Sequence, residues 1–253
     1  MTKRPGEVEL LAHSGKLLAQ VFGHLDRLDL VGMTTMRIND LVEELIVKDL
    51  ESRPASKGQY GYAYAINSSR NQVVCHGVPS ATEVLEDGDI VNFDITLEKN
   101  GWIADSSKTY FVGEVSFPAR RLVQATYDAM WKGIKAVRPG ARLGDVGHAI
   151  ERHAKKCGYS VVREYCGHGI GREMHEAPQV LHWGKPGTGV ELREGMVFTI
   201  EPMINQGQRA IRNGDDGSTI KTLDGKLSAQ FEHTVAVTRT GVRVLTLRPE
   251  ETR

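Results

Sequence analysis

The sequence predicts an α+β protein in which two helices precede a set of strands and the same order then repeats. Helical periodicity dominates residues 7–46 and 118–158, and short β-like runs separated by turn residues follow each stretch. The two halves, about 1–115 and 116–253, indicate an internal duplication around one shared antiparallel sheet core. A plain α+β domain without duplication is the alternative. No Pro- or Ser-rich linker divides the 253 residues, which favours a single domain.

In the first half, apolar residues from Glu7 to Leu28 recur at three- and four-residue steps, the period of an amphipathic helix. A second helix begins at the threonine pair 34–35 and ends before Pro54. The strand-like runs that follow are YAYAI (62–66), QVVCHGV (72–78), DIVNFDITL (89–97) and WIADSSKTYFVG (102–113). Between the last two runs, the Asn-Gly pair at 100–101 predicts a two-residue hairpin turn.

In the second half, a helix begins near Pro118 and stops at the Pro-Gly pair 139–140. The next helix begins near Leu143, and Gly158 is its expected C-terminal cap. The strand-like runs after it are YSVVREY (159–165), GMVFTIEPMI (195–204), STIKTL (218–223), AQFEHTVAVT (229–238) and RVLTL (243–247).

Composition limits the classes of partner. Lys plus Arg and Asp plus Glu balance at 32 each, so no net charge argues for nucleic acid or an anionic membrane surface as the main partner. The three cysteines have no CxxC spacing, which fits a reducing compartment, and we expect the cytoplasm. The first residues lack the apolar run of a signal peptide, and no run reaches transmembrane length.

Two carboxylates lie on the predicted hairpin. If residues 100–101 form the turn, Thr96 pairs with Asp105, so Asp94 and Asp105 become diagonal neighbours on one face. Side by side they repel, and burial would raise the pKa of at least one of them, whereas a cation between them removes that cost. A solvated edge hairpin would be the better interpretation if the pair stood alone.

Other metal-binding side chains accompany the pair. Glu201 and Glu232 each lie inside an apolar strand-like run, where an unpaired charge is costly, and His168 lies in a Gly-rich turn. Four carboxylates and one imidazole do not match the closed Cys/His shell of a structural zinc site. They suit two divalent ions about 3.5–4 Å apart that are bridged by carboxylates. A glycosidase needs only two carboxyl groups, so a metallohydrolase explains the set better.

These segments resemble a known family along the whole chain. The run YCGHGIGREMHEAPQVLHW (165–183) is similar to the signature of the type I methionine aminopeptidases. The segments NFD, ADSSK, FTIEP and AQFEHT resemble the other metal-binding segments of that family, in the same order. The resemblance implies the pita-bread fold of two pseudo-symmetric halves. It also implies the compact bacterial form, because neither zinc-finger cysteines near the start nor a long insertion in the second half is seen.

The resemblance implies a dinuclear metal site with Co, Mn, Fe or Zn. The implied ligands are Asp94, Asp105, His168, Glu201 and Glu232. Asp105 and Glu232 would bridge the ions, and a bridging hydroxide would attack the carbonyl group after the initiator methionine. Glu201 would transfer the proton of that water. His175 would donate a hydrogen bond to the carbonyl oxygen, and His76 would lie near the scissile amide.

The substrate pocket departs from the family. Tyr62 holds an aromatic position of the pocket, and Tyr165 is expected to line it as well. The departures are Asn67 in place of Cys, Glu173 in place of Gly, Met174 in place of an aromatic residue, and Ser218 in place of Trp. Because a methionine pocket should be small and largely apolar, Asn67 is expected to affect selectivity or pocket shape and to leave the hydrolytic chemistry intact.

The resemblance implies nascent polypeptide N-termini with a small second residue as substrates, and a transient association with the ribosome. We expect a monomer with no nucleic acid sequence recognition and no membrane partner. One alternative is a proline-specific aminopeptidase or dipeptidase of the same fold, although those relatives usually carry an additional N-terminal domain. Another is a binding module that has lost catalysis.

Overall fold

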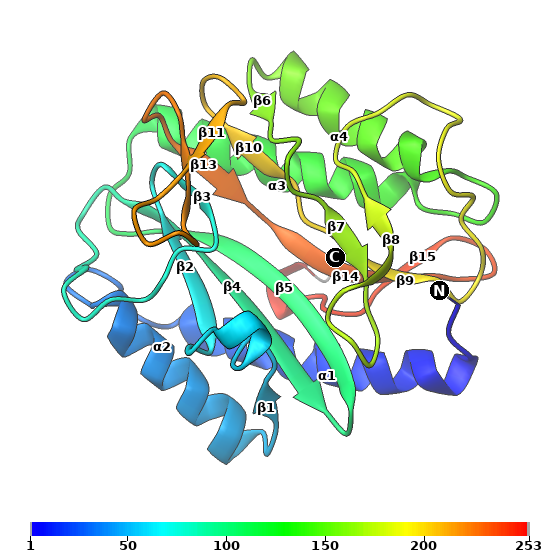
Figure 1. Ribbon diagram of the computed structural model, residues 1–253, viewed down its shortest axis with the longest axis horizontal. Coiled ribbons are helices and arrows are strands. Elements are labelled where there is room, and N and C mark those ends of the chain that lie inside the picture. Colours follow the sequence, from blue (N-terminus) through cyan, green and yellow to red (C-terminus); the bar gives the residue numbers. More distant parts are fainter. Residues whose placement is uncertain (1, 252–253) are drawn as a thin grey trace.

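The computed structural model describes residues 2–251 and contains a curved sheet flanked by helices (Figure 1). The helices are α1 (Pro5–Leu25), α2 (Thr35–Glu44), α3 (Phe117–Ala136) and α4 (Leu143–Lys156). Shorter turns are a π-helical turn (Leu45–Asp49) and two 3-10 turns (Gln59–Gly61 and Pro249–Glu251). Within the described residues, no helix combines the length and the apolar character needed to cross a bilayer.

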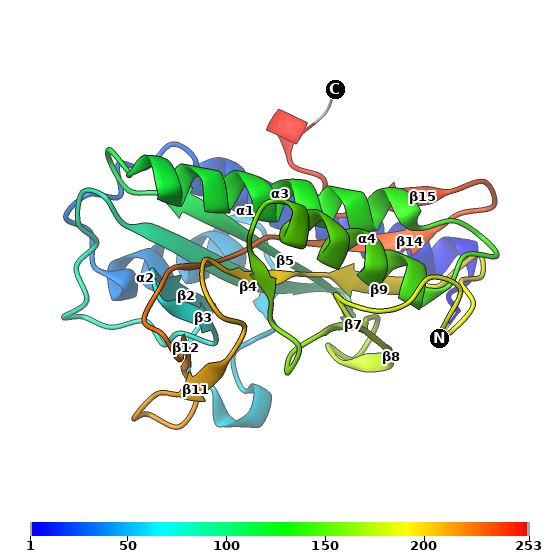
Figure 2. The same ribbon diagram turned by 90° about the horizontal axis from the view of Figure 1, so that it is seen from above.

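The main sheet has the strand order β1-β4-β5-β14-β9-β7-β8, with β2 beside β4 and β15 beside β14. Its strands are β1 (Arg53–Pro54), β2 (Ile66–Arg70), β4 (Ile90–Lys99), β5 (Trp102–Phe111), β7 (Gly167–Gly169), β8 (Glu176–Val180), β9 (Val197–Ile200), β14 (Glu232–Val237) and β15 (Val242–Val244). One small sheet contains β13 (Ser228–Gln230), β10 (Met203–Asn205) and β6 (Ser160–Val161). A second contains β11 (Ile211–Asn213), β12 (Ile220–Thr222) and β3 (Val73–Cys75). Helices α1, α3 and α4 lie on one side of the main sheet, and the small sheet with β11 and β12 lies on the other (Figure 2).

The predicted α+β class and the four predicted helices are confirmed. Thr34 caps α2, since its side chain accepts a hydrogen bond from the backbone N–H of Arg37. Gly158 follows Cys157, the C-cap of α4, and has φ +85°, the left-handed conformation that glycine adopts most easily. The local signals in the sequence therefore set the helix ends.

The predicted hairpin is confirmed residue by residue. Asn100 and Gly101 both have positive φ, as a two-residue hairpin turn of this type requires. Strands β4 and β5 then pair Lys99 with Trp102 and Thr96 with Asp105. Asp94 precedes Thr96 by two residues on β4, so its side chain lies on the same face of the hairpin as that of Asp105.

Several strand predictions were wrong. The run 62–66 contributes only its last residue to a strand, and the run 159–165 only two residues. The run 229–238 breaks at Phe231 into β13 and β14, which belong to different sheets. Strands β7, β8 and β11 were not predicted. Their sequences contain glycine, proline or exposed polar residues, which carry little intrinsic strand preference, so tertiary pairing alone makes them strands.

Each half of the sequence has its own apolar core. In the first half, α1 and α2 pack on β4 through residues such as Phe22, Ile38 and Phe93. In the second half, α3 and α4 pack on β9 through residues such as Met130 and Phe198. The halves meet where β5 pairs with β14, and that ladder contains two residue pairs, Ser107 with Glu232 and Ser106 with His233.

The chain ends with a segment that we call the C-terminal strap, residues 245–251. It begins beside β14, where the N–H of Leu245 donates to the carbonyl of Thr234, and it lies on the helix side of the sheet (Figure 2). Helix α1 approaches it closely at Gly15, because a Cβ there would lie 2.2 Å from the carbonyl oxygen of Leu245. The start of the strap is therefore packed against α1.

The strap makes the stability of the fold sensitive to acid. Burial raises the pKa of Glu251, but the hydrogen bond to His233 and the charges of His233 and Arg248 outweigh burial and lower it to about 2. As pH falls from the ordinary value of 4.5 toward 2, the unfolded chain takes up a proton that the folded carboxylate does not. We therefore expect the thermal midpoint of the metal-free protein to fall faster over this range in the wild type than in Glu251→Gln. Parallel midpoint curves for the two proteins would contradict this expectation.

Candidate active site

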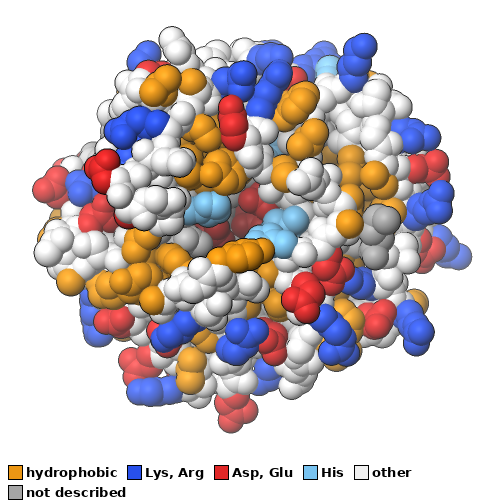
Figure 3. Space-filling view, in the orientation of Figure 1, with side chains coloured by type: hydrophobic (Ala, Val, Ile, Leu, Met, Phe, Trp, Pro, Cys, Tyr) orange, Lys and Arg blue, Asp and Glu red, His pale blue; other side chains and the backbone are white. Residues whose placement is uncertain are grey.

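A cavity of about 990 Å³ opens on the face of the molecule that Figure 3 shows. All predicted site residues line it, namely Tyr62, His76, Asp94, Asp105, Tyr165, His168, His175, Glu201 and Glu232. In the space-filling view, acidic side chains form the floor of a central hollow and histidines lie at its sides (Figure 3). The fold thus brings together residues from both halves of the chain.

The carboxyl groups lie on or beside adjacent strands. Asp94 and Asp105 project from β4 and β5 and line the cavity, where each carboxyl group shifts the pKa of the other. Glu232 is the first residue of β14 and is 1% exposed. Glu201 follows β9, and its Oε1 accepts a hydrogen bond from Thr199 Oγ1 at 2.7 Å. The sheet therefore presents four carboxyl groups to one cavity.

Burial dominates the acidity of these groups. It raises the pKa of Asp94 to about 6 and that of Glu201 to about 8. Burial, together with the neighbouring carboxylates, raises the pKa values of Asp105 and Glu232 well above their usual range. The Arg248 guanidinium acts in the opposite direction on Glu232. Four buried carboxylates are costly together unless positive charge is close to them.

His168 reaches the cavity because glycine flanks it. A Cβ at Gly167 would lie 2.4 Å from the carbonyl oxygen of Thr199, and one at Gly169 would lie 2.2 Å from that of Ala177. Glycine thus lets β7 fit between β8 and β9. The Nε2 atom of His168 lies 3.6 Å from Asp105 Oδ2 and 3.5 Å from Glu201 Oε1. Burial lowers the pKa of His168 to about 4, so the imidazole is neutral at pH 7 and able to bind a metal.

The donor set fits divalent metal ions. Ligand atoms of Asp105, His168 and Glu232 all lie within 4.8 Å of one another. Asp105 Oδ1 and Glu232 Oε1 are buried without a hydrogen-bond partner, which is costly for an oxygen that carries negative charge. Carboxylate oxygens with one imidazole nitrogen suit Mn, Fe, Co or Zn.

Two further histidines lie beside the carboxylates. The ring centroid of His175 is 4.4 Å from that of His168. His76 has φ +56°, an unusual backbone conformation for a non-glycine residue, and its ring meets that of Tyr165 edge-on at 5.2 Å. Desolvation lowers the pKa values of His76 and His175, and the neighbouring His175 further lowers that of His76. Both rings are therefore neutral at pH 7 and can donate an N–H hydrogen bond.

The residues that depart from the family pattern are not equivalent in space. Asn67 lies opposite Asp94 across β2 and β4 and lines the cavity. Met174 lines it as a buried side chain and Ser218 as an exposed one. Glu173 is exposed and is not among the lining residues. Tyr62 forms part of the wall, fixed by a hydrogen bond from its hydroxyl group to the carbonyl of Ile66 at 2.7 Å.

Sequence reasoning gave no role to three residues that support Glu201. Thr199 donates to one carboxylate oxygen, and Gln230 Nε2 lies 3.5 Å from the other. His182 Nε2 accepts the backbone N–H of Glu201 at 3.1 Å. Thr199 and Gln230 each precede a cavity glutamate by two residues. That spacing, which places them near the same face of the chain, was the available signal.

Comparisons with known proteins agree with this site. Residues 9–239 match the family described as metallopeptidase family M24. The chain is 47% identical to a methionine aminopeptidase of Rickettsia prowazekii, covering 94% of this chain and 92% of that protein. It is 42% identical to a methionine aminopeptidase of Escherichia coli, covering 99% and 95%. A crystal structure of the Rickettsia prowazekii enzyme superposes with a TM-score of 0.95 at 45% identity, covering 98% of this chain and 99% of that one. The chain therefore belongs to metallopeptidase family M24 and, within it, to the methionine aminopeptidases.

Proposed function

We propose that this protein is a metal-dependent aminopeptidase that removes the initiator methionine from nascent polypeptides with a small second residue. The observation that carries the proposal is the convergence of four carboxyl groups and a neutral imidazole on one cavity. The same donors occur in a chain that is 42–47% identical to methionine aminopeptidases over nearly its full length.

Two divalent ions are the proposed cofactors. The residues that would hold them are Asp94, Asp105, His168, Glu201 and Glu232. Asp105 and Glu232 would be shared by both ions, as the family resemblance implies, and each has a buried oxygen without a hydrogen-bond partner among the described residues. When bound, the ions would polarise the scissile carbonyl group and make a water molecule nucleophilic at neutral pH.

Side chains that line the cavity would carry out proton transfer, oxyanion stabilisation and substrate positioning. Glu201 would accept the proton of the attacking water, because its carboxylate lines the cavity and Thr199 orients it. His175 would donate its N–H to the carbonyl oxygen as negative charge develops there. His76 would orient the scissile amide. Tyr62 and Tyr165 would form walls of the substrate pocket.

The remaining expectations follow from this activity. We propose that residues 1–253 form one catalytic domain built from two related halves. The protein would act as a monomer in the cytoplasm, on nascent N-termini and in transient association with ribosomes. It would recognise neither a nucleic acid sequence nor a membrane.

The test is peptide hydrolysis by metal-stripped protein. Release of methionine from Met-Ala-Ser would be measured beside release of the first residue from an X-Pro peptide, with and without Mn, Co, Fe or Zn. Cleavage of only the methionine peptide, and only with metal, would support the proposal. Cleavage of X-Pro would move the protein to the proline-specific enzymes, and inactivity with every metal would favour a binding module.

The pocket departure at position 67 gives a prediction about selectivity. No described residue hydrogen-bonds the side-chain amide of Asn67, which lines the cavity beside Asp94. A methionine side chain would desolvate that amide without pairing it. We expect Asn67→Cys to raise kcat/KM for Met-Ala-Ser about tenfold, equivalent to ~1.4 kcal/mol. Ser218→Ala, at an exposed lining position, is the control and should change it less. An unchanged or lower value for Asn67→Cys would contradict the prediction.

A further inference from the structure

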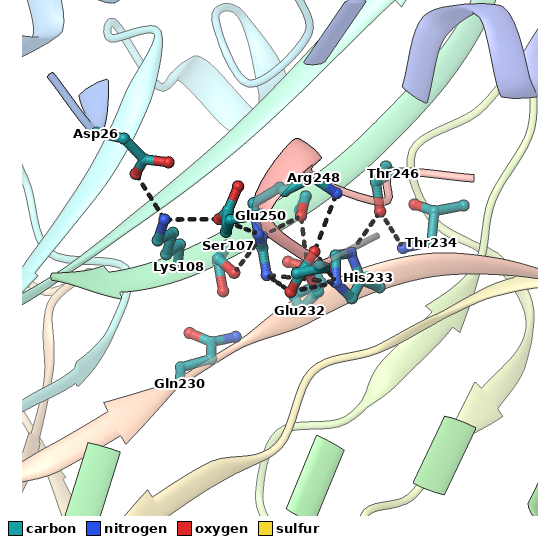
Figure 4. A network of polar contacts seen from close by, with 12 residues as sticks. Asp26, Ser107, Lys108, Gln230, Glu232, His233, Thr234, Thr246, Arg248 and Glu250 are labelled. Atoms are coloured by element: carbon teal, nitrogen blue, oxygen red, sulfur yellow. Dashed lines mark hydrogen bonds and ion pairs between the residues drawn. The ribbon is translucent and has the colours of Figure 1, made fainter. Parts of the chain in front are cut away.

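A buried arginine lies on the opposite side of the sheet from the cavity. Arg248 belongs to the C-terminal strap and is 1% exposed, although its guanidinium carries a permanent charge. Figure 4 shows it among polar side chains of β5, β14 and the strap. Burial of such a charge is costly, and an apolar residue of similar size often gives equal or better stability. Stability alone therefore does not explain its presence.

The guanidinium touches both strands at the junction of the two halves. Arg248 Nη1 donates to Ser106 Oγ at 3.2 Å and to the carbonyl oxygen of Ser107 at 3.3 Å, both on β5. The hydroxyl group of Ser106 in turn donates to the carbonyl oxygen of Glu232 at 2.7 Å. Arg248 Nη2 lies 3.3 Å from His233 Nε2 on β14. Two of the residues that Arg248 contacts, Ser106 and His233, directly follow Asp105 on β5 and Glu232 on β14 in the sequence.

The other strap residues hold the same junction. Thr246 Oγ1 accepts the backbone N–H of Thr234 at 3.1 Å and lies 2.9 Å from His233 Nδ1. Glu251 accepts a hydrogen bond from Arg248 Nη2 at 3.0 Å, which fixes the guanidinium from its outer side. The ring of Phe22 in α1 lies 5.3 Å from the guanidinium carbon. Contacts from β5, β14, α1 and Glu251 therefore fix the orientation of Arg248, although its Nε has no hydrogen-bond partner among the described residues.

The junction itself has few backbone contacts. The β5–β14 ladder contains two residue pairs, and the side chain of Thr234 adds bonds to the backbone N–H and carbonyl of Asp105. The strands belong to different halves of the sequence, so their separation is not fixed by a short connection. A planar guanidinium with several N–H donors can hold both strands at once, which a single ammonium group or a methyl group cannot.

We propose that Arg248 is a positioning residue that fixes β5 relative to β14 and thereby sets the separation of the Asp105 and Glu232 carboxylates on the other face. This inference rests on the proposed metal centre, in which those two carboxylates bridge the ions. Partners that orient metal ligands from outside the ligand shell typically contribute 10- to 100-fold to metal affinity or activity. The C-terminal strap would then contribute to metal binding by positioning the carboxylates of β5 and β14.

Metal affinity gives the test, independently of turnover. Mn²⁺ would be titrated into metal-stripped wild type, Arg248→Met and Arg248→Lys by calorimetry, and the thermal midpoint of each metal-free protein would be recorded. We expect Arg248→Met to weaken Kd about tenfold or more, and Arg248→Lys to weaken it less. kcat for Met-Ala-Ser should fall more than KM changes, because the strap does not touch the cavity.

Two controls separate positioning from general stability. Glu9→Gln removes an exposed ion pair between α1 and Arg243 of β15, which does not involve Arg248, and should leave Kd unchanged. Ile46→Val makes a small cavity in the first-half core and should lower the thermal midpoint without changing Kd.

A lowered midpoint with wild-type Kd in Arg248→Met would overturn the inference and leave Arg248 a structural residue. If Arg248→Met does not fold, Arg248→Lys decides, since a weakened Kd supports the inference and an unchanged Kd overturns it. Absence of Mn²⁺ binding by the wild type itself would instead overturn the proposed metal centre, and the inference with it.

Discussion

Replacement of Glu232 by Gln is expected to lower kcat/KM for Met-Ala-Ser by a factor of about 10³ or more, which corresponds to ~4 kcal/mol of transition-state stabilisation. The amide has almost the same shape but no charge, so it is a poor ligand for a hard divalent ion. Glu232 is the proposed bridge, and one of its oxygens is buried without another partner. Its loss should therefore weaken both ion positions at once.

The same substitution should stabilise the metal-free protein, which separates lost chemistry from lost folding. Burial and the neighbouring carboxylates raise the pKa of Glu232 well above its usual range. A raised carboxyl pKa reduces the free energy of unfolding at pH values above the unfolded pKa, so this cost is present at neutral pH and disappears in acid. Glu232→Gln removes the cost. We expect its metal-free thermal midpoint to exceed that of the wild type at pH 7 and to approach it near pH 4.

Activity, Mn²⁺ affinity and the metal-free midpoint would be measured together. Glu191→Gln, a change in an exposed glutamate outside the cavity lining, is the matched control and should leave all three unchanged. Retention of more than a tenth of the wild-type kcat/KM by Glu232→Gln would contradict the bridging role.

The sequence was most informative where local rules decide the structure. The Asn-Gly turn determines the register of β4 and β5, and the register places Asp94 and Asp105 on one face. A residue such as Glu232 could be singled out because a charge inside an apolar run needs a partner. These inferences need only the period of a strand and the cost of burial.

Local rules failed where distant segments decide the structure. Strand β7 consists of Gly167, His168 and Gly169, which have little strand preference alone and become a strand between β8 and β9. The position of the strap also depends on segments that are distant in the sequence. Nothing in the sequence near Arg248 indicates that it lies behind Glu232, because that contact depends on the path of the chain after β15. Such residues are found only from the tertiary structure.

Replacement of His175 by Ala is expected to lower kcat by a factor of about 10²–10³ and to leave Mn²⁺ affinity unchanged. That factor is typical for loss of one hydrogen-bond donor to a developing oxyanion. Desolvation lowers the pKa of His175, so at pH 7 the ring is a neutral donor whose N–H stabilises charge that appears only in the transition state. KM for Met-Ala-Ser should accordingly change little, since the ground-state carbonyl carries no full charge.

The separation between kcat and metal affinity distinguishes His175 from its neighbour. The two rings lie only 4.4 Å apart, but His168 belongs to the group whose ligand atoms converge and His175 does not. His168→Ala should therefore weaken Mn²⁺ binding, whereas His175→Ala should not. His175→Gln retains a donor and should recover part of kcat, and His24→Ala, at an exposed site on α1, is the control. If His175→Ala instead weakened Mn²⁺ binding and kept kcat within threefold of wild type at saturating metal, His175 would support the metal ligands and not the oxyanion.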